Sequence, residues 1–133
     1  ILGEHGDSSF PVLSQATVGG QVISDFPNFS DEKAHAAYEK ERKAAYTIIE
    51  SKGSTYYGIA AVLSHIVKAV LNDSKSVLPV SIPLHNFHGH SGVALSVPCV
   101  VGRNGVETVL QPKLNWEEKQ ALEKSVNTLK QYL

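Results

Sequence analysis

His5 is a residue whose type and setting could do chemistry. It lies in the segment Gly3-Glu4-His5-Gly6-Asp7-Ser8, whose glycines let the backbone turn and let another molecule come close. Histidine is the usual general acid or base, because its unperturbed pKa falls nearest to neutrality. The setting makes His5 a candidate proton donor. A lone histidine is more often a structural or surface group, so these residues alone leave both interpretations open.

A second group, His85, His88 and His90, could bind a metal ion. Three histidines within six residues are a plausible ligand set for zinc or nickel. No acidic or cysteine ligand lies nearby, and the composition is that of a polar loop between two strands. We favour an exposed loop and predict no metal site. His35 and His65 fall on predicted helices, and we assign them no role.

The composition indicates one soluble globular domain. The chain has 133 residues, of which 42% are hydrophobic and 19% are charged, which is ordinary for a folded domain with its own core. A net charge of −1, with Lys and Arg scattered along the chain, gives no reason to expect binding to nucleic acid. No run approaches the roughly 18 apolar residues that span a bilayer. We therefore expect neither nucleic acid nor membrane as a partner.

Cys99 is the only cysteine, so no disulfide can form within the chain. Its apolar surroundings, Val97 to Val101, predict a buried, inert thiol rather than a nucleophile. A free thiol fits a reducing compartment such as the cytoplasm. The chain begins at Ile1-Leu2 and contains no Met, so we expect residue 1 to be a boundary within a longer protein.

Three helices are predicted. The first runs from Ser30, a capping residue, to Gly53, a stop signal. It should pack one apolar face inward, with its charged run 39–43 forming a solvated face. The second, from Thr55 to about Asn72, is apolar around most of its circumference, which predicts a central and mostly buried helix. Gly58 within it indicates a close approach by another group.

The third helix begins at Asn115, with Glu118 in capping-box position. Its apolar residues form a single stripe of Leu122, Val126, Leu129 and Leu133. This helix should therefore pack one face on the rest of the domain.

Strands are predicted before and between these helices. Residues 1–29 carry short apolar runs typical of a strand or two with irregular connections. The segment 77–84 contains two prolines and should be an edge strand. Segments 93–101 and 106–110 are joined around Arg103-Asn104-Gly105, a strong hairpin signal. This order predicts an α+β fold with antiparallel strands and three main helices. No glycine-rich phosphate loop follows a predicted strand.

The motifs resemble those of the lactate/malate dehydrogenase family. Segment 3–8 resembles the family's catalytic-histidine motif. Segment 52–60, Lys-Gly-Ser-Thr-Tyr-Tyr-Gly-Ile-Ala, is similar to the start of the family's long active-site helix. Segment 101–106, Val-Gly-Arg-Asn-Gly-Val, resembles a hairpin common in bacterial members. The resemblance covers the whole chain in order and is closest to the C-terminal, catalytic domain of bacterial L-lactate dehydrogenases.

This resemblance implies a role for each matching residue. His5 would protonate the carbonyl oxygen of a small 2-oxo acid as hydride arrives from NADH, and would act as the base in the reverse direction. Thr55 would line the substrate pocket. Ile59 would pack on the nicotinamide ring and keep that face dry. Gly6 and Asp7 would shape the turn that carries the histidine. The parent enzyme would use NAD and interconvert L-lactate and pyruvate.

The resemblance also implies that essential groups lie before residue 1. These are the nucleotide-binding Rossmann domain, the carboxylate that orients the histidine and the arginines that contact substrate. Residues 1–133 would be a single C-terminal substrate domain lacking that N-terminal domain. Without the orienting carboxylate, the rate should fall by orders of magnitude. We predict that the isolated chain neither binds NADH tightly nor turns over.

Other functions remain open at this point. Glu4, Ser8 and Thr55 resemble the residues of lactate rather than malate enzymes, and a malate or branched 2-hydroxy-acid dehydrogenase is the alternative. A different class of function is a binding or assembly module without activity, because apolar surface that has lost its partner domain would drive self-association. Family members assemble as dimers or tetramers, so the resemblance implies a homo-oligomer. Size exclusion at several concentrations would test self-association, and metal analysis would test metal binding by His85, His88 and His90.

Overall fold

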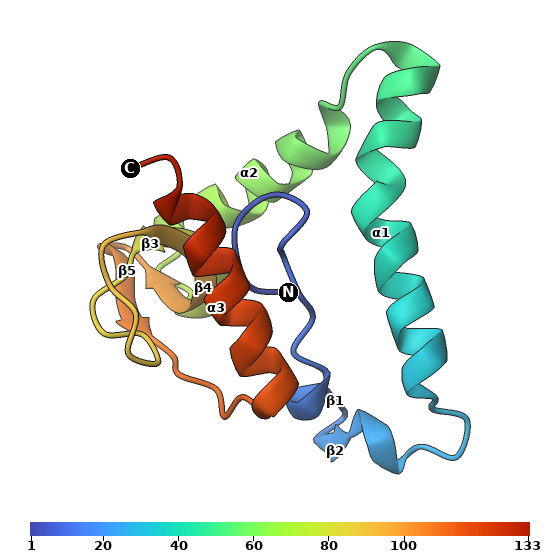
Figure 1. Ribbon diagram of the computed structural model, residues 1–133. Helices are drawn as coiled ribbons and strands as arrows, with labels where there is room; N and C mark the ends of the chain where they lie inside the picture. The colour runs from blue at the N-terminus through green and yellow to red at the C-terminus, as the bar shows by residue number, and fades with distance from the viewer.

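The computed structural model describes residues 1–133 as an α+β fold with three main helices, as predicted (Figure 1). The elements in chain order are β1 (Thr17–Val18), β2 (Gln21–Val22), α1 (Asp31–Lys52), α2 (Tyr57–Leu71), β3 (Ser76–Pro83), β4 (Ala94–Gly102), β5 (Gly105–Val109) and α3 (Trp116–Lys130). Single 3-10 turns lie on either side of the β1–β2 hairpin. None of the helices combines the length and the apolar character needed to cross a bilayer.

The main sheet is antiparallel, with the order β3-β4-β5. The predicted edge strand is confirmed as β3, in which Pro79 lies opposite Pro98 of β4. The predicted hairpin is also confirmed, since Gly102 pairs with Gly105 across a two-residue turn. Gly105 has a φ of +86°, a left-handed conformation that glycine adopts without steric penalty. The local turn chemistry therefore sets the register of β4 and β5.

The core lies between this sheet and α3, which crosses its face in Figure 1. Strand β4 alternates, and its buried positions point to the core: Leu95, Val97, Cys99 and Val101. Cys99 is buried as predicted, and burial raises the pKa of its thiol. The loop between β3 and β4 contributes Leu84 and Phe87. Leu2 and Phe10 of the N-terminal segment complete this side of the core.

Helix α3 begins as predicted at the N-cap Asn115. The backbone N–H of Glu118 donates to Asn115 Oδ1 at 2.9 Å, and the Asn115 N–H donates back to Glu118 Oε2 at 2.9 Å. Leu122 and Val126 are buried, which confirms the predicted stripe at these positions. The prediction was wrong for Leu133, which is exposed because the helix ends at Lys130 before the stripe reaches it.

Helices α1 and α2 have the predicted limits, except that α2 begins two residues later than predicted. Both helices are less buried than predicted. Ser30 caps α1, and Gly53 ends it with a φ of +86°. No residue of α1 is buried, and Ala69 is the only buried residue of α2. In Figure 1, α1 stands apart from the sheet and α2 leads up to it. Nothing in the chain lies within 4 Å of a Cβ placed at Gly58.

The predictions of an inward-packed α1 and a buried α2 were therefore wrong for this chain. An apolar pattern identifies the face of a helix that avoids water, but it does not identify the surface that covers it. Within this chain only the C-terminal end of α2 meets the core, through Ala69 and Val70, and the rest of the helix has no cover.

Candidate active site

The predicted proton donor, His5, lies in a short loop whose base is fixed by backbone hydrogen bonds. The N–H of Leu2 donates to the Phe10 carbonyl at 2.8 Å, and the Phe10 N–H donates back at 2.9 Å. Gly3 is paired in the same way with Ser96 of β4, at 3.1 and 3.0 Å. Residues 4–9 thus leave the sheet and return to it. We call this segment the His5 loop.

The two carboxylates beside His5 are engaged elsewhere. Glu4 accepts a hydrogen bond from the Ser8 hydroxyl at 2.6 Å, and Asp7 pairs with Arg42 at 3.1 Å. Both therefore stabilise the turn. The His5 side chain is exposed at the tip of the loop. A histidine presented in this way is accessible to a small molecule in solution.

Helix α1 reaches the His5 loop through residues one turn apart. The Tyr38 hydroxyl donates to the Ser9 carbonyl. Arg42 donates from Nη1 to the Asp7 carbonyl at 3.2 Å, in addition to its ion pair. The Glu39 carboxylate raises the pKa of Arg42, and Arg42 lowers the pKa of Glu39. The prediction of a fully solvated charged run was wrong at Arg42, because this side chain turns toward the loop.

His5 lines a cavity of about 640 Å³ between the loop, the two long helices and the sheet. Its polar lining includes Glu4, Arg42 and Tyr46, and Val62 of α2 contributes an apolar side chain. The cavity therefore offers an imidazole, a guanidinium and a phenol to one occupant. The Glu4 and Glu41 carboxylates also line this cavity, so its lining carries charges of both signs.

The other predicted site residues, Thr55 and Ile59, do not line this cavity. Thr55 lies in the connection before α2, and Ile59 lies in the first turn of α2 with 55% of its surface exposed. At this corner the Lys52 ammonium lies 4.0 Å from the ring centroid of Tyr56 and 4.5 Å from that of Tyr57. The apolar and aromatic side chains of this corner are exposed, so no other part of the chain covers them.

The histidine cluster between β3 and β4 forms a tight turn in which Phe87 pairs with His90. Phe87 is buried and contacts the His88 ring edge-on, with centroids 4.8 Å apart. The structure contains no group of three or more His, Cys, Asp or Glu side chains placed to hold a metal ion. His85, His88 and His90 thus do not converge on a common ligand position.

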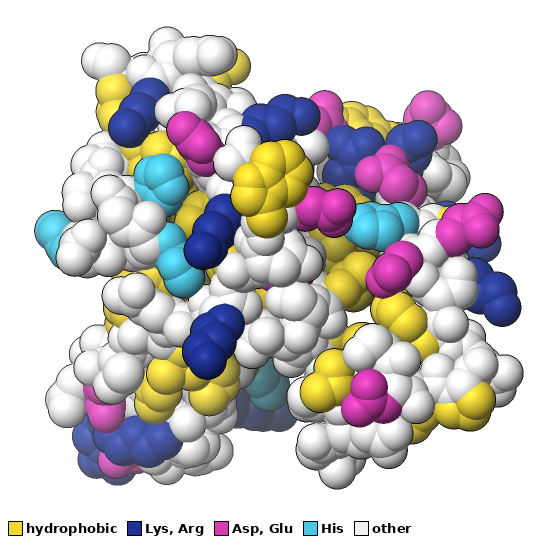
Figure 2. Space-filling view, turned by 60° about the horizontal axis from the view of Figure 1, so that its bottom comes forward, with side chains coloured by type: hydrophobic (Ala, Val, Ile, Leu, Met, Phe, Trp, Pro, Cys, Tyr) yellow, Lys and Arg dark blue, Asp and Glu magenta, His cyan; other side chains and the backbone are white.

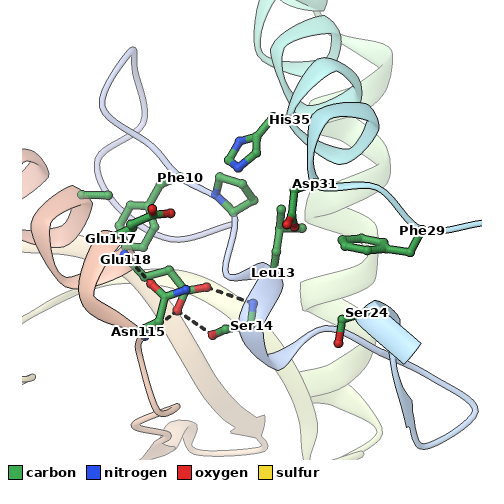
Figure 3. Close-up of a pocket in the computed structure, with 12 residues that line it drawn as sticks. Phe10, Leu13, Ser14, Ser24, Phe29, Asp31, His35, Asn115, Glu117 and Glu118 are labelled. Carbon is green, nitrogen blue, oxygen red and sulfur yellow. Dashed lines mark hydrogen bonds between the residues drawn. The ribbon is translucent and has the colours of Figure 1, made fainter. Parts of the chain in front are cut away.

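A second cavity, of about 440 Å³, lies between the starts of α1 and α3 (Figure 3). Its floor is a hydrogen-bonded group in which Glu118 accepts from the Ser14 N–H at 3.0 Å and from the Ser14 hydroxyl at 2.6 Å. Glu118 is buried, so these bonds satisfy a carboxylate that would otherwise be costly to desolvate. The group fixes the start of α3 against the N-terminal segment.

The face of the molecule in Figure 2 carries basic and acidic side chains intermingled, without a patch of one sign.

Sequence reasoning missed three residues near His5, namely Arg42, Tyr46 and Ser125. Arg42 fell within a charge run, and Tyr46 was one of two tyrosines on the first helix. Ser125 was detectable in principle, because it is a polar residue three positions after Leu122 on the apolar face of the last helix. It is fully buried, and its Oγ accepts the Glu4 N–H at 2.7 Å.

Residues 1–133 match the family model of the lactate/malate dehydrogenase alpha/beta C-terminal domain. The chain belongs to the lactate/malate dehydrogenase family and corresponds to its C-terminal domain.

Bacterial L-lactate dehydrogenases are among its relatives. That of Halalkalibacterium halodurans is 48% identical over 130 residues, which are 98% of this chain and 41% of the relative. That of Lacticaseibacillus casei is 40% identical over 137 aligned residues, covering 100% of this chain and 42% of the relative. The chain therefore spans about two-fifths of the length of the relatives it matches.

Solved structures agree with this assignment. The minor L-lactate dehydrogenase of Enterococcus mundtii in a ligand-bound form superposes with a TM-score of 0.92 at 38% identity, covering 98% of this chain and 43% of that one. The malate dehydrogenase of Aeropyrum pernix gives a TM-score of 0.89 at 32% identity, covering 98% of this chain and 42% of that one. The fold is thus common to lactate and malate enzymes.

Proposed function

We propose that this chain is the catalytic C-terminal domain of an NAD-dependent L-lactate dehydrogenase, which interconverts L-lactate and pyruvate. The observation that carries the proposal is the match of the whole chain to bacterial L-lactate dehydrogenases at 40–48% identity, with His5 exposed beside a cavity. Such an enzyme would serve carboxylic acid metabolism and the end of glycolysis in the cytoplasm.

His5 is the proton donor in this proposal. Its imidazolium gives a proton to the carbonyl oxygen of pyruvate, the carbonyl carbon gains hydride, and the product is the hydroxyl of lactate. In the reverse direction neutral His5 removes the hydroxyl proton. NADH, when bound, supplies the hydride. General acid catalysis needs a donor within hydrogen-bonding reach of the carbonyl oxygen, and the fixed base of the His5 loop supports that requirement.

Thr55 and Ile59 are proposed to contact substrate and nicotinamide, respectively. The exposed apolar side chain of Ile59 suits one face of an aromatic ring, and the exposed Thr55 offers a hydroxyl to a polar substrate. Val62, three residues beyond Ile59 on the same helix face, lines the cavity that contains His5. This face of α2 therefore connects the proposed nicotinamide contact with the proposed proton donor.

The rest of the dinucleotide needs another domain. No glycine-rich phosphate loop occurs in residues 1–133, so we propose that a nucleotide-binding domain precedes them in the full-length protein. Exposed apolar residues of α2, including Leu63 and Val67, support a partner surface against these helices. We propose that the nucleotide-binding domain covers part of this surface. A second subunit of a homo-oligomer would cover another part. The isolated chain should be inactive.

A malate or branched 2-hydroxy-acid specificity is the second candidate, because the structure of a malate dehydrogenase superposes with a TM-score of 0.89. A non-catalytic assembly role would apply if the native polypeptide consisted of these residues alone.

The test compares the full-length protein with the isolated 133-residue chain. Each is assayed for NADH oxidation with pyruvate, oxaloacetate and a branched 2-oxo acid. We expect turnover by the full-length protein, fastest with pyruvate, and none by the isolated chain. Preference for oxaloacetate would transfer the assignment to malate. Turnover by the isolated chain would refute the requirement for a second domain.

A further inference from the structure

The His5 loop is held by a buried hydroxyl group from the opposite end of the chain. Ser125 lies on α3 and has no exposed surface. Its Oγ accepts the backbone N–H of Glu4, the residue directly before His5, at 2.7 Å. This is the hydrogen bond from α3 that lies nearest to His5 in the sequence.

The same hydroxyl group takes part in a closed arrangement with Ser8. The Ser8 hydroxyl donates to Glu4 Oε2 at 2.6 Å, and Ser8 Oγ lies 3.3 Å from Ser125 Oγ. Because Ser8 has one hydroxyl proton, Ser125 can donate its own proton to Ser8. Both the backbone and the side chain of Glu4 are then satisfied. The arrangement spans the loop on both sides of His5.

Two further features fix the distance between Ser125 and the loop. A Cβ at Gly3 would lie 2.8 Å from Ser125 Oγ, and Gly3 has a φ of +105°, so only glycine allows this close approach. Glu118 lies seven residues before Ser125, on the same face of α3, and is tied to Ser14 (Figure 3). The position of α3 is thus set independently of the loop.

We propose that Ser125 is a positioning residue for His5. It fixes the peptide before His5, and thereby the direction in which the imidazole meets the substrate. This inference rests on the proposed function, since it concerns proton transfer by His5. A displacement of about 1 Å in a reacting group can reduce a rate by about 10²-fold.

The test uses the full-length protein with Ser125→Ala, and Thr128→Ala as the matched control. Thr128 is half-buried on the same helix, and its hydroxyl donates only to the Lys124 carbonyl within that helix. We expect Ser125→Ala to lower kcat by about 10- to 100-fold, with the KM for NADH within about twofold of wild type. The Glu4 amide should exchange its hydrogen faster in the variant. Thr128→Ala should change none of these quantities.

Two results would overturn the inference. One is a folded Ser125→Ala variant with wild-type kcat. The other is a parallel loss of kcat, NADH affinity and thermal stability, which indicates general loosening.

If Ser125→Ala does not fold, Ser125→Cys carries the test, because sulfur is a weak acceptor. The kcat of Ser125→Cys should also fall, and a wild-type kcat would refute the role of Ser125. If wild type shows no turnover, the proposed function fails, and unchanged Glu4 exchange in the variant would refute positioning separately.

Discussion

Strand β4 and helix α3 bury their apolar side chains at the centre of the molecule, whereas α1 and α2 leave most of theirs exposed. Leu122 of α3 is 1% exposed, and Leu63 of α2 is 57% exposed, although both are leucines in the middle of helices with clear apolar faces. The difference indicates that stability within this chain comes from the sheet and α3, while α1 and α2 supply surface for a partner. The His5 loop lies between the two regions and is bonded to both.

The largest effect on stability is expected from truncating Leu122, and the matched truncation of Leu63 should have almost none. Leu122→Ala removes a fully packed side chain and should lower the free energy of unfolding of the 133-residue chain by about 2–5 kcal/mol. Leu63→Ala should change it by less than about 0.5 kcal/mol, because its side chain already faces water. Urea denaturation measures both. Equal losses would mean that α2 is packed in solution and would remove the contrast between the regions.

A smaller effect is expected at the start of α3. Glu118→Ala leaves the Ser14 N–H and the Asn115 N–H without their acceptor and should cost about 2–3 kcal/mol of unfolding free energy. The neighbour Glu117 is exposed, so Glu117→Ala should cost only about 0.3–1 kcal/mol from the helix dipole. Thermal unfolding of the two variants measures both stability costs. A cost for Glu117→Ala as large as that for Glu118→Ala would show that the buried hydrogen bonds are not the cause.

The smallest effect is a local pH dependence at the β4–β5 hairpin. The Arg103 N–H donates to Asp73 Oδ1 at 2.7 Å, and this bond together with Lys75 lowers the pKa of Asp73 below its ordinary value of 3.8. A lowered pKa means that the contact contributes at neutral pH and is lost as pH falls through the folded-state pKa. The Arg103 amide shift, followed by NMR, should therefore titrate below pH 3.8. Asp73→Asn should abolish this titration, and a midpoint above the ordinary value would contradict it.

The contrast between the regions also explains what could be predicted from the sequence. The limits of α1, the capping box of α3 and the turn at Gly105 were predictable because each depends on neighbouring residues. The exposure of α2 was not, because burial depends on surfaces that the apolar pattern does not identify. Within the candidate site, His5 was identified by its motif. The contacts of Arg42 and Ser125 were missed because they join residues 35 and 121 positions apart.

The most direct test of the account is the kcat of His5→Gln in the full-length protein, with the exposed His65→Gln as control. Glutamine can form hydrogen bonds but cannot donate a proton as an acid. We predict that kcat for pyruvate reduction falls by about 10²- to 10⁴-fold, while the Kd for NADH and the thermal stability stay at wild-type values. His65→Gln should leave kcat unchanged. A His5→Gln kcat within a few fold of wild type would contradict the assignment of His5 as the proton donor.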